Sequence, residues 1–182
     1  RAVGVRGIGG FLLAANAFDR EALQKLRDRK RRPHKPFAVM AADVAAVRRF
    51  CAVPPEAEAL LTSPEAPVVI LDVLPEVVRD ARLPLDLLTP DAPTLGVMLP
   101  TSPLHLFLLA PLAADPVPAF ELLVMTSGNR GGEPICLTNA EALERLGGIA
   151  DLLLCHDREI NLRADDSLAV IQHGAPQLWR RA

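Results

Sequence analysis

Short apolar runs that alternate with amphipathic helical segments constrain the fold of this chain more than any other feature. The run at 68–71 is continuously apolar between Pro67 and Asp72, which is typical of a strand buried on both faces. Similar runs occur at 3–5, 11–14, 37–40, 95–99, 122–125, 152–155 and 168–171. Strands that alternate with helices, without internal repeats, predict a single α/β domain built on a twisted mixed sheet with flanking helices.

Residues that cap helices mark where the helical segments begin. Aspartate, serine and threonine side chains accept hydrogen bonds from the free N–H groups of a first helical turn, and proline is tolerated there. Helices are expected from Asp19 to about Arg31, from Asp43 to about Phe50, over 54–61, over about 104–112 after Ser102, and over 138–146, where Glu141 and Thr138 have capping-box spacing. The proline-rich stretch 74–94 is weakly periodic, and we expect it to be a surface excursion.

Composition limits the possible functions. The 182 residues suit one domain with a sizeable core, and the net charge of −2 disfavours a general nucleic-acid coat, which needs a broad excess of cations. One tryptophan, six phenylalanines and no tyrosine leave few platforms for base stacking. Nucleic acid is therefore not the expected partner.

The cysteines indicate a redox compartment, and the chain ends indicate how the domain is placed in a polypeptide. Cys51, Cys136 and Cys155 form an odd set without CxxC spacing, so neither a disulfide framework nor a zinc site is expected, and reduced thiols in the cytoplasm fit. No stretch offers the roughly 18 consecutive apolar residues that would span a bilayer. The sequence begins inside an expected strand and ends as abruptly, so we expect residues 1–182 to form one domain of a longer polypeptide.

A basic segment, residues 29–36, places four cations directly before Pro33 and a fifth between Pro33 and Pro36. Pro33 and Pro36 restrict the backbone after Lys30 and Arg32, and Lys35 lies between the prolines. In extended geometry Lys30 and Arg32 share one face and could hold one anion together. A solvated cationic helix end, favoured by the helix dipole, is the alternative interpretation.

A small-residue loop, residues 126–134, follows the apolar run 122–125. Gly128 permits close approach of the backbone, while Thr126, Ser127 and Asn129 offer hydroxyl and amide groups to phosphate or ribose oxygens. The loop lacks the Gly-Lys-Ser/Thr ending of a P-loop, and an ordinary strand-to-helix connection is the alternative. Together with the basic segment it indicates a nucleoside triphosphate site, because several phosphate charges need both cations and backbone donors.

Residues 163–167 place an arginine, two carboxylates and a hydroxyl before another apolar run. We expect Arg163 and Ser167 to line the pocket, whereas Asp165 and Asp166 could help bind the Mg²⁺ that accompanies ATP, pair with the basic segment or form a turn. The glycines at 7–10 precede a strand-like run and not a helix, so they do not fit a dinucleotide fingerprint. The four histidines are scattered, and no protein metal site or nucleophilic triad is expected.

These motifs resemble a known family. Lys30-Arg31-Arg32 with Ser127-Gly128-Asn129 is similar to the KxR…SxN signature of YrdC-like proteins, which adenylate small carbamate-type acids with ATP. The segments 7–11, 29–40, 95–100, 125–129 and 163–167 resemble, in the same order, the YrdC-like domain of the HypF carbamoyltransferase family, which acts in nickel–iron hydrogenase maturation. Arg6, Leu12 and Gly131 depart from this pattern, since relatives commonly have lysine, histidine and serine at those places.

The resemblance implies ATP and Mg²⁺ as cofactors and a carbamate derived from carbamoyl phosphate as the substrate. Lys30 and Arg32 would be the catalytic residues that hold the phosphates and the carbamate. The nucleotide would be bound by Ser127, Asn129, Arg163, Ser167, Lys35 and Thr126. In complete family members the carbamoyl-AMP would serve a HypE-type acceptor protein, on which the carbamoyl group is the precursor of the cyanide ligands of the hydrogenase.

Two alternatives stay open. Free-standing YrdC-like proteins make threonylcarbamoyl-AMP for tRNA modification, but they usually carry a Pro-Thr-Glu-Thr segment near the N-terminus, which the residues 7–11 do not match. A non-enzymatic double-stranded RNA-binding module would use the basic segment on a concave sheet and would bind RNA with a strong salt dependence. A requirement for threonine would distinguish the first alternative from carbamate adenylation. The RNA-binding module would not use ATP, which distinguishes the second.

Overall fold

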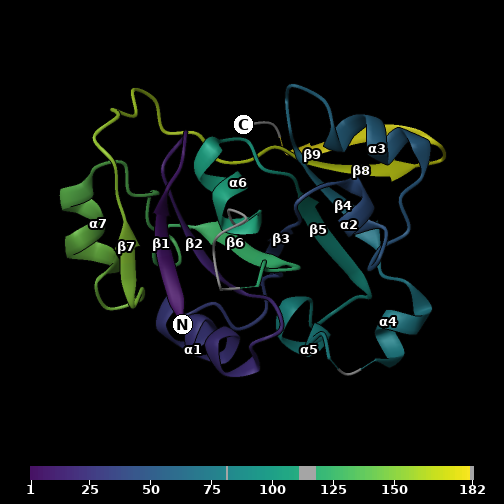
Figure 1. Ribbon diagram of the computed structural model, residues 1–182, viewed down its shortest axis with the longest axis horizontal. Helices are drawn as coiled ribbons and strands as arrows, with labels where there is room; N and C mark the ends of the chain where they lie inside the picture. The colour runs from purple at the N-terminus through teal and green to yellow at the C-terminus, as the bar shows by residue number, and fades with distance from the viewer. Residues whose placement is uncertain (81, 111–117, 181–182) are drawn as a thin grey trace.

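A single mixed sheet runs through the whole chain in the computed structural model, which describes residues 1–80, 82–110 and 118–180 (Figure 1). The strand order is β7-β1-β2-β6-β3-β5-β4-β8-β9. The strands are β1 Ala2–Arg6, β2 Phe11–Asn16, β3 Ala38–Met40, β4 Val68–Asp72, β5 Thr94–Met98, β6 Leu123–Ser127, β7 Leu152–Leu154, β8 Leu168–Gln172 and β9 Ala175–Arg180. The helices are α1 Arg20–Lys30, α2 Val44–Val47, α3 Pro55–Leu61, α4 Pro75–Arg79, α5 Leu85–Leu88, α6 Pro103–Leu109 and α7 Asn139–Leu146.

Both strand directions occur along the sheet. β1, β2, β6 and β3 form consecutive antiparallel pairs, as do β5 with β4 and β8 with β9. The pairs β1–β7, β3–β5 and β4–β8 are parallel. The expected single-domain α/β fold with a mixed sheet and flanking helices is thus confirmed.

The two faces of the sheet are covered unequally. On one face, strand residues such as Leu13 and Val124 join side chains of α1, α3, α5 and α7 in the larger core cluster. On the other face a smaller cluster, which includes Met40, Met98 and Met125, packs against Leu104 and Leu109 of α6. Burying apolar area on both faces stabilises the sheet, and the less covered face leaves room for a site.

The caps that start the helices form as expected. Asp19, Asp43, Ser102 and Thr138 each accept a backbone N–H from the first turn of α1, α2, α6 and α7, and Glu141 completes the capping box. α2 ends at Val47, short of the expected Phe50. The expected helix over 104–112 is observed as Pro103–Leu109, and residues 111 and 112 lie outside the described residues.

Two expectations need correction. The stretch 74–94 is not only a surface excursion, since it contains α4 and α5, and Leu83 and Leu88 are buried in the core. Pro75 is the first residue of α4 and Pro84 directly precedes α5, and both helices are too short to give a clear apolar period. The last strand, β9, was not expected, because all six of its residues are exposed and give no alternating pattern. It pairs with β8 across a tight turn in which His173 and Gly174 both have positive φ, the geometry of a type I′ hairpin.

Within the described part of the chain, no helix is long and apolar enough to cross a membrane. Cys51 and Cys136 are buried free thiols, and Cys155 is an exposed one.

Candidate functional site

A pocket of about 320 Å³ lies on the less covered face of the sheet, and we call it the sheet pocket. Its floor is formed by strand residues, among them Ala38, Gly96 and Met125. Cationic and acidic groups from distant segments surround this floor. They are Arg32, Lys35, Asp165, Asp166 and Arg180, accompanied by Phe37, Thr126, Ser127 and Trp179.

Strand pairing brings the basic segment to the small-residue loop. β3 follows the basic segment directly and pairs with β6, so that Ala38 lies opposite Met125, one residue before Thr126. The two motifs are therefore neighbours in space. Arg32 Nη1 donates a hydrogen bond of 3.1 Å to Thr126 Oγ1, which is 94 positions away in the sequence. The prediction that they form one site is supported by this contact.

The end of α1 directs Lys30 and Arg32 differently. Arg31 has a left-handed conformation with φ 52°, and the Arg31 and Arg32 N–H groups donate to the carbonyls of Asp28 and Arg27 in a Schellman-type cap. The expectation that Lys30 and Arg32 share a face of an extended segment is therefore wrong. Lys30 is the last helical residue and is only 1% exposed, whereas Arg32 lines the sheet pocket.

The Lys30 ammonium anchors the loop that follows β6. Its Nζ donates to the Asn129 carbonyl at 2.6 Å, to Asn129 Oδ1 at 2.7 Å and to the Ser127 carbonyl. An ammonium has three donors, so all of them are engaged by protein oxygens. The geometry thus assigns Lys30 to holding Ser127 and Asn129 in place, beneath the pocket surface.

The loop itself is tightly held. Ser127 Oγ donates to Asn129 Oδ1 at 2.7 Å, and the Gly128 N–H donates to the Phe11 carbonyl at 2.7 Å. A Cβ at Gly128 would lie 2.5 Å from the same Phe11 oxygen, so the close crossing of β2 and the loop requires glycine there. The Ser127 hydroxyl is consequently fixed at the edge of the sheet pocket.

An arginine–phenylalanine stack supports the basic segment. The guanidinium carbons of Arg27 and Arg32 lie 4.5 and 5.1 Å from the centroid of the Phe37 ring. The buried Arg27 donates from Nη1 to the carbonyls of Arg32 at 2.6 Å, Pro33 at 3.1 Å and Lys35 at 3.4 Å, and from Nε to that of Leu87 at 2.7 Å. Arg27 therefore shapes the segment that presents Arg32 and Lys35.

Among the described residues, Lys30, Arg32 and Lys35 have no counter-charge in direct contact. Arg32 donates to the carbonyls of Lys35 and Pro36 and to the Thr126 hydroxyl, all of which are neutral acceptors. Burial, and then repulsion from Arg32 and Lys35, lowers the pKa of Lys30 to about 7. Burial and the neighbouring Arg27 lower the pKa of Arg32 to about 10, and burial and Arg32 lower that of Lys35. Each shift records a cost of holding positive charge that a bound polyanion would relieve.

The opposite side of the pocket carries two carboxylates and an arginine from β9. Arg180 Nη1 lies 2.9 Å from Asp165 Oδ2, and its Nη2 donates to the Asp166 carbonyl at 2.7 Å. Burial, with the neighbouring Asp165 charge, raises the pKa of Asp166 above its ordinary value. Within the described residues no three histidine, cysteine or acidic side chains gather as a metal site. A divalent cation here would need oxygens from a ligand as well as these carboxylates.

The residues expected to bind nucleotide fall into two groups. Thr126, Ser127 and Lys35 line the sheet pocket. Asn129 does not line it, and its side-chain oxygen accepts a hydrogen bond from Lys30. Arg163 and Ser167 are not among the lining residues: Arg163 Nε donates to the Ile135 carbonyl at 2.8 Å, and the Ser167 carbonyl accepts from the Val68 N–H at 2.8 Å. They flank Asp165 and Asp166, which do line it.

Sequence reasoning missed three contributors to the site. Trp179 and Arg180 belong to the unexpected strand β9, and a lone tryptophan next to an arginine at a chain end gave no motif. The third is Arg27, which precedes the basic segment and whose spacing from Leu23 and Lys30 places all three on the buried side of α1.

The chain is similar to known proteins over nearly its whole length. The family profile Sua5_yciO_yrdC, described as telomere recombination, matches residues 1–182. A carbamoyltransferase HypF of Rhodobacter capsulatus is 44% identical over 181 residues, which are 98% of this chain and 22% of that protein. The chain thus spans about a fifth of the length of the curated relatives it matches.

Solved structures show the same fold. The crystal structure of full-length HypF in the phosphate- and nucleotide-bound form superposes with a TM-score of 0.87 at 45% identity, covering 100% of this chain and 27% of that one. Sua5 of P. abyssi complexed with L-threonine has a TM-score of 0.79 at 19% identity, covering 99% of this chain and 50% of that one, a likeness that extends to the fold alone.

Proposed function

We propose a function from the premise that this chain belongs to the Sua5_yciO_yrdC family and is homologous to HypF-type carbamoyltransferases. In this proposal the chain binds ATP in the sheet pocket and adenylates carbamate, giving carbamoyl-AMP and pyrophosphate. The observation that carries it is the convergence of Arg32, Lys35 and Ser127 on one pocket, with none of the described carboxylates paired to Arg32.

The uncompensated cations favour a ligand with several negative charges. A guanidinium and an ammonium in a partly dry pocket attract phosphate more strongly than they would in water, and the Arg32 fork can hold two phosphate oxygens. Thr126 and Ser127 add hydroxyl groups at the end of β6. Trp179, on the opposite side, offers an aromatic surface for a base.

The proposed step needs no general base. The carbamate is already an anion, and one of its oxygens attacks the α-phosphorus of ATP. The new O–P bond replaces the bond from the α-phosphorus to the bridging oxygen, and pyrophosphate leaves with that electron pair. The protein contributes positioning and charge stabilisation. Arg32 and Lys35 would hold the phosphates, and Lys30 would act through Ser127 and Asn129.

Magnesium fits this arrangement as a companion of the nucleotide. Asp165 and Asp166 line the pocket across from the cations and could supply one or two carboxylate oxygens, which is the usual protein share of a nucleotide-bound Mg²⁺. The ion would neutralise charge on the departing pyrophosphate. Asp165 would first have to share its oxygens with Arg180.

The wider role is proposed from the relatives. Because the matched proteins are named carbamoyltransferases and are several times longer, we propose that this domain makes the activated carbamoyl group for a transfer carried out elsewhere in such a protein. A HypE-type protein would be the acceptor in hydrogenase maturation.

The direct test is formation of AMP and pyrophosphate from ATP and Mg²⁺ with either carbamate or threonine plus bicarbonate. Product with carbamate alone supports the proposal, and product with threonine alone would replace it with threonylcarbamoyl-AMP synthesis. Arg32→Gln should abolish product formation. Arg79→Gln, an exposed change on α4 outside the pocket, is the matched control and should leave it unchanged.

A further inference from the structure

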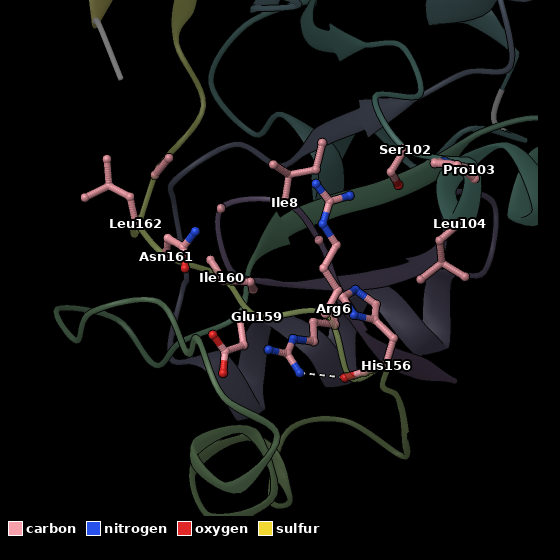
Figure 2. Close-up of a pocket in the computed structure, with 14 residues that line it drawn as sticks. Arg6, Ile8, Ser102, Pro103, Leu104, His156, Glu159, Ile160, Asn161 and Leu162 are labelled. Atoms are coloured by element: carbon pink, nitrogen blue, oxygen red, sulfur yellow. Dashed lines mark hydrogen bonds between the residues drawn. The ribbon is translucent and has the colours of Figure 1, made fainter.

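We propose that a second pocket, which we call the arginine pocket, binds a small oxyanion through Arg6 and Arg158. This pocket has a volume of about 540 Å³ and lies between the end of β1, the glycine turn at 7–9, the start of α6 and the segment 156–164 (Figure 2). It shares no lining residue with the sheet pocket. The inference therefore does not depend on the proposed adenylation.

Arg6 is a buried cation without a counter-charge. Its side chain is only 6% exposed, and its Nη1 donates to Asn139 Oδ1 at 2.9 Å and to the His156 carbonyl at 2.6 Å. Both acceptors are neutral. The Nε is also buried, and no described residue accepts a hydrogen bond from it. An opposite charge that enters the pocket would offset the cost of burying this cation.

A second guanidinium lines the same pocket. Arg158 is exposed and takes part in none of the hydrogen bonds or ion pairs found among the described residues. Glu159 is the single carboxylate among the lining residues and forms no ion pair with either arginine. The lining charges therefore sum to a net positive pocket. Figure 2 shows Arg6 between Glu159 and His156, with its hydrogen bond to the His156 carbonyl.

The remaining walls define the class of ligand. Ile8, Leu104 and Ile160 are apolar, which strengthens electrostatic attraction inside the pocket, and the Asn161 amide adds a possible donor. His156 Nδ1 is buried and likewise unpartnered in the described structure. Two guanidinium forks suit the planar oxygens of a carboxylate or the tetrahedral oxygens of a phosphate. Both ligands are compact oxyanions, and the experiment must distinguish a carboxylate from a phosphate.

The test is titration calorimetry at low salt with sodium acetate and, separately, sodium phosphate. The protein carries Arg32→Gln and Lys35→Gln, so that anions in the sheet pocket do not contribute, and circular dichroism checks that it is folded. One anion should bind saturably with one site per chain, and whichever binds more tightly identifies the carboxylate or the phosphate class. Binding of neither anion would overturn the proposal.

Four further variants locate the binding and test the sign of the charge that the pocket prefers. Arg158→Gln should weaken the anion about tenfold or more, whereas Glu159→Gln should tighten it severalfold, because it removes the single negative charge of the lining. Arg79→Gln should have no effect. Unchanged affinity in Arg158→Gln, or weaker binding in Glu159→Gln, would overturn the assignment. Arg6→Gln should also lose binding, and because Arg158 is exposed the conclusion does not rest on Arg6 variants remaining folded.

Discussion

The Lys30 ammonium lies 2.7 Å from the side-chain oxygen of Asn129, 99 positions away, and this contact joins the end of α1 to the loop after β6. Lys30 also holds the main-chain oxygens of Ser127 and Asn129. A cation that lies beneath a loop with every donor engaged acts first on the shape of that loop. Arg32, two residues later, lines the pocket, where the N–H groups that do not bond Thr126, Lys35 or Pro36 can reach a ligand.

Lys30 and Arg32 should therefore differ in their effect on stability. Lys30→Ala removes three partly buried hydrogen bonds, those to the Ser127 carbonyl and to the two oxygens of Asn129, and should lower the free energy of unfolding by about 1–3 kcal/mol. Arg32→Ala should cost less, and both should abolish adenylation. Urea unfolding measures the difference, with Lys25→Ala as the control, because Lys25 lies exposed on the same helix in an ion pair with Glu21. A Lys30→Ala protein as stable as Lys25→Ala would contradict the anchoring role.

The buried Lys30 also predicts a pH dependence of stability. Its pKa is lowered from 10.5 to about 7, chiefly by burial, so between these values the unfolded chain binds a proton at Lys30 that the folded chain does not. The free energy of unfolding should therefore rise with pH across that window, by at most about 1.4 kcal/mol per pH unit. Below about pH 7 Lys30 is charged in both states, and the full cost of burying its charge is present. Unfolding curves at pH 6 to 9 should show this rise in the natural chain and lose it in Lys30→Met. Equal slopes in the two proteins would exclude the effect.

Much of the fold could be read from the sequence, because local signals agreed with the tertiary structure. The apolar runs became strands, and Asp19, Ser102 and Thr138 capped helices as expected. The sequence pattern did not predict the elements whose burial does not follow a local apolar period. β9 has no buried residue, and α5 is a four-residue helix between prolines, yet it places Leu88 in the core. β9 forms because it pairs with β8, and no local sequence pattern encodes that pairing.

The candidate site was predictable in its parts but not in its geometry. The basic segment and the loop could each be found, because phosphate recognition favours clustered cations and small residues. Their meeting depends on the pairing of β3 with β6. The different directions of Lys30 and Arg32 depend on the left-handed Arg31, a conformation that a β-carbon disfavours and that the sequence of a basic run does not signal.

Trp179 should report nucleotide binding directly. It is the single tryptophan of a chain without tyrosine, it is 58% exposed, and it lines the sheet pocket. A bound base or phosphate changes the surroundings of the indole, so ATP should change the fluorescence in a saturable way, and Arg32→Gln should remove the change. If calorimetry detects ATP binding while the fluorescence stays constant, the nucleotide does not occupy the sheet pocket.

Arg27 should affect catalysis without touching the ligand. Arg27→Lys keeps the charge but cannot hold the carbonyls of Arg32, Pro33 and Lys35 with one planar group. The segment should lose its fixed shape, and the KM for ATP should rise roughly tenfold, equivalent to about 1.4 kcal/mol, with a smaller change in kcat. Steady-state kinetics tests this, with Arg29→Lys as the control on the same helix. A fall in kcat at constant KM would argue against a positioning role.

The loop after β6 offers a pair of matched glycine substitutions. A methyl group at Gly128 would meet the Phe11 carbonyl oxygen at 2.5 Å and the Phe11 Cβ at 2.7 Å, so Gly128→Ala must push β2 and the loop apart. A methyl group at Gly131 would meet its nearest neighbour, the Arg31 carbonyl oxygen, at 3.6 Å, an ordinary contact. Gly128→Ala should therefore destabilise the chain by about 1–3 kcal/mol and move Ser127 away from the pocket, whereas Gly131→Ala should be nearly neutral.

Thermal unfolding and ATP binding together measure the outcome. Gly128→Ala should lose ATP affinity even at temperatures where it is fully folded, because the same displacement that relieves the clash moves the Ser127 hydroxyl and the Asn129 oxygen that Lys30 holds. Gly131→Ala should bind ATP as the natural chain does. Equal behaviour of the two variants would mean that the loop yields without cost, and that the close crossing of Phe11 and Gly128 does not set the geometry of the site.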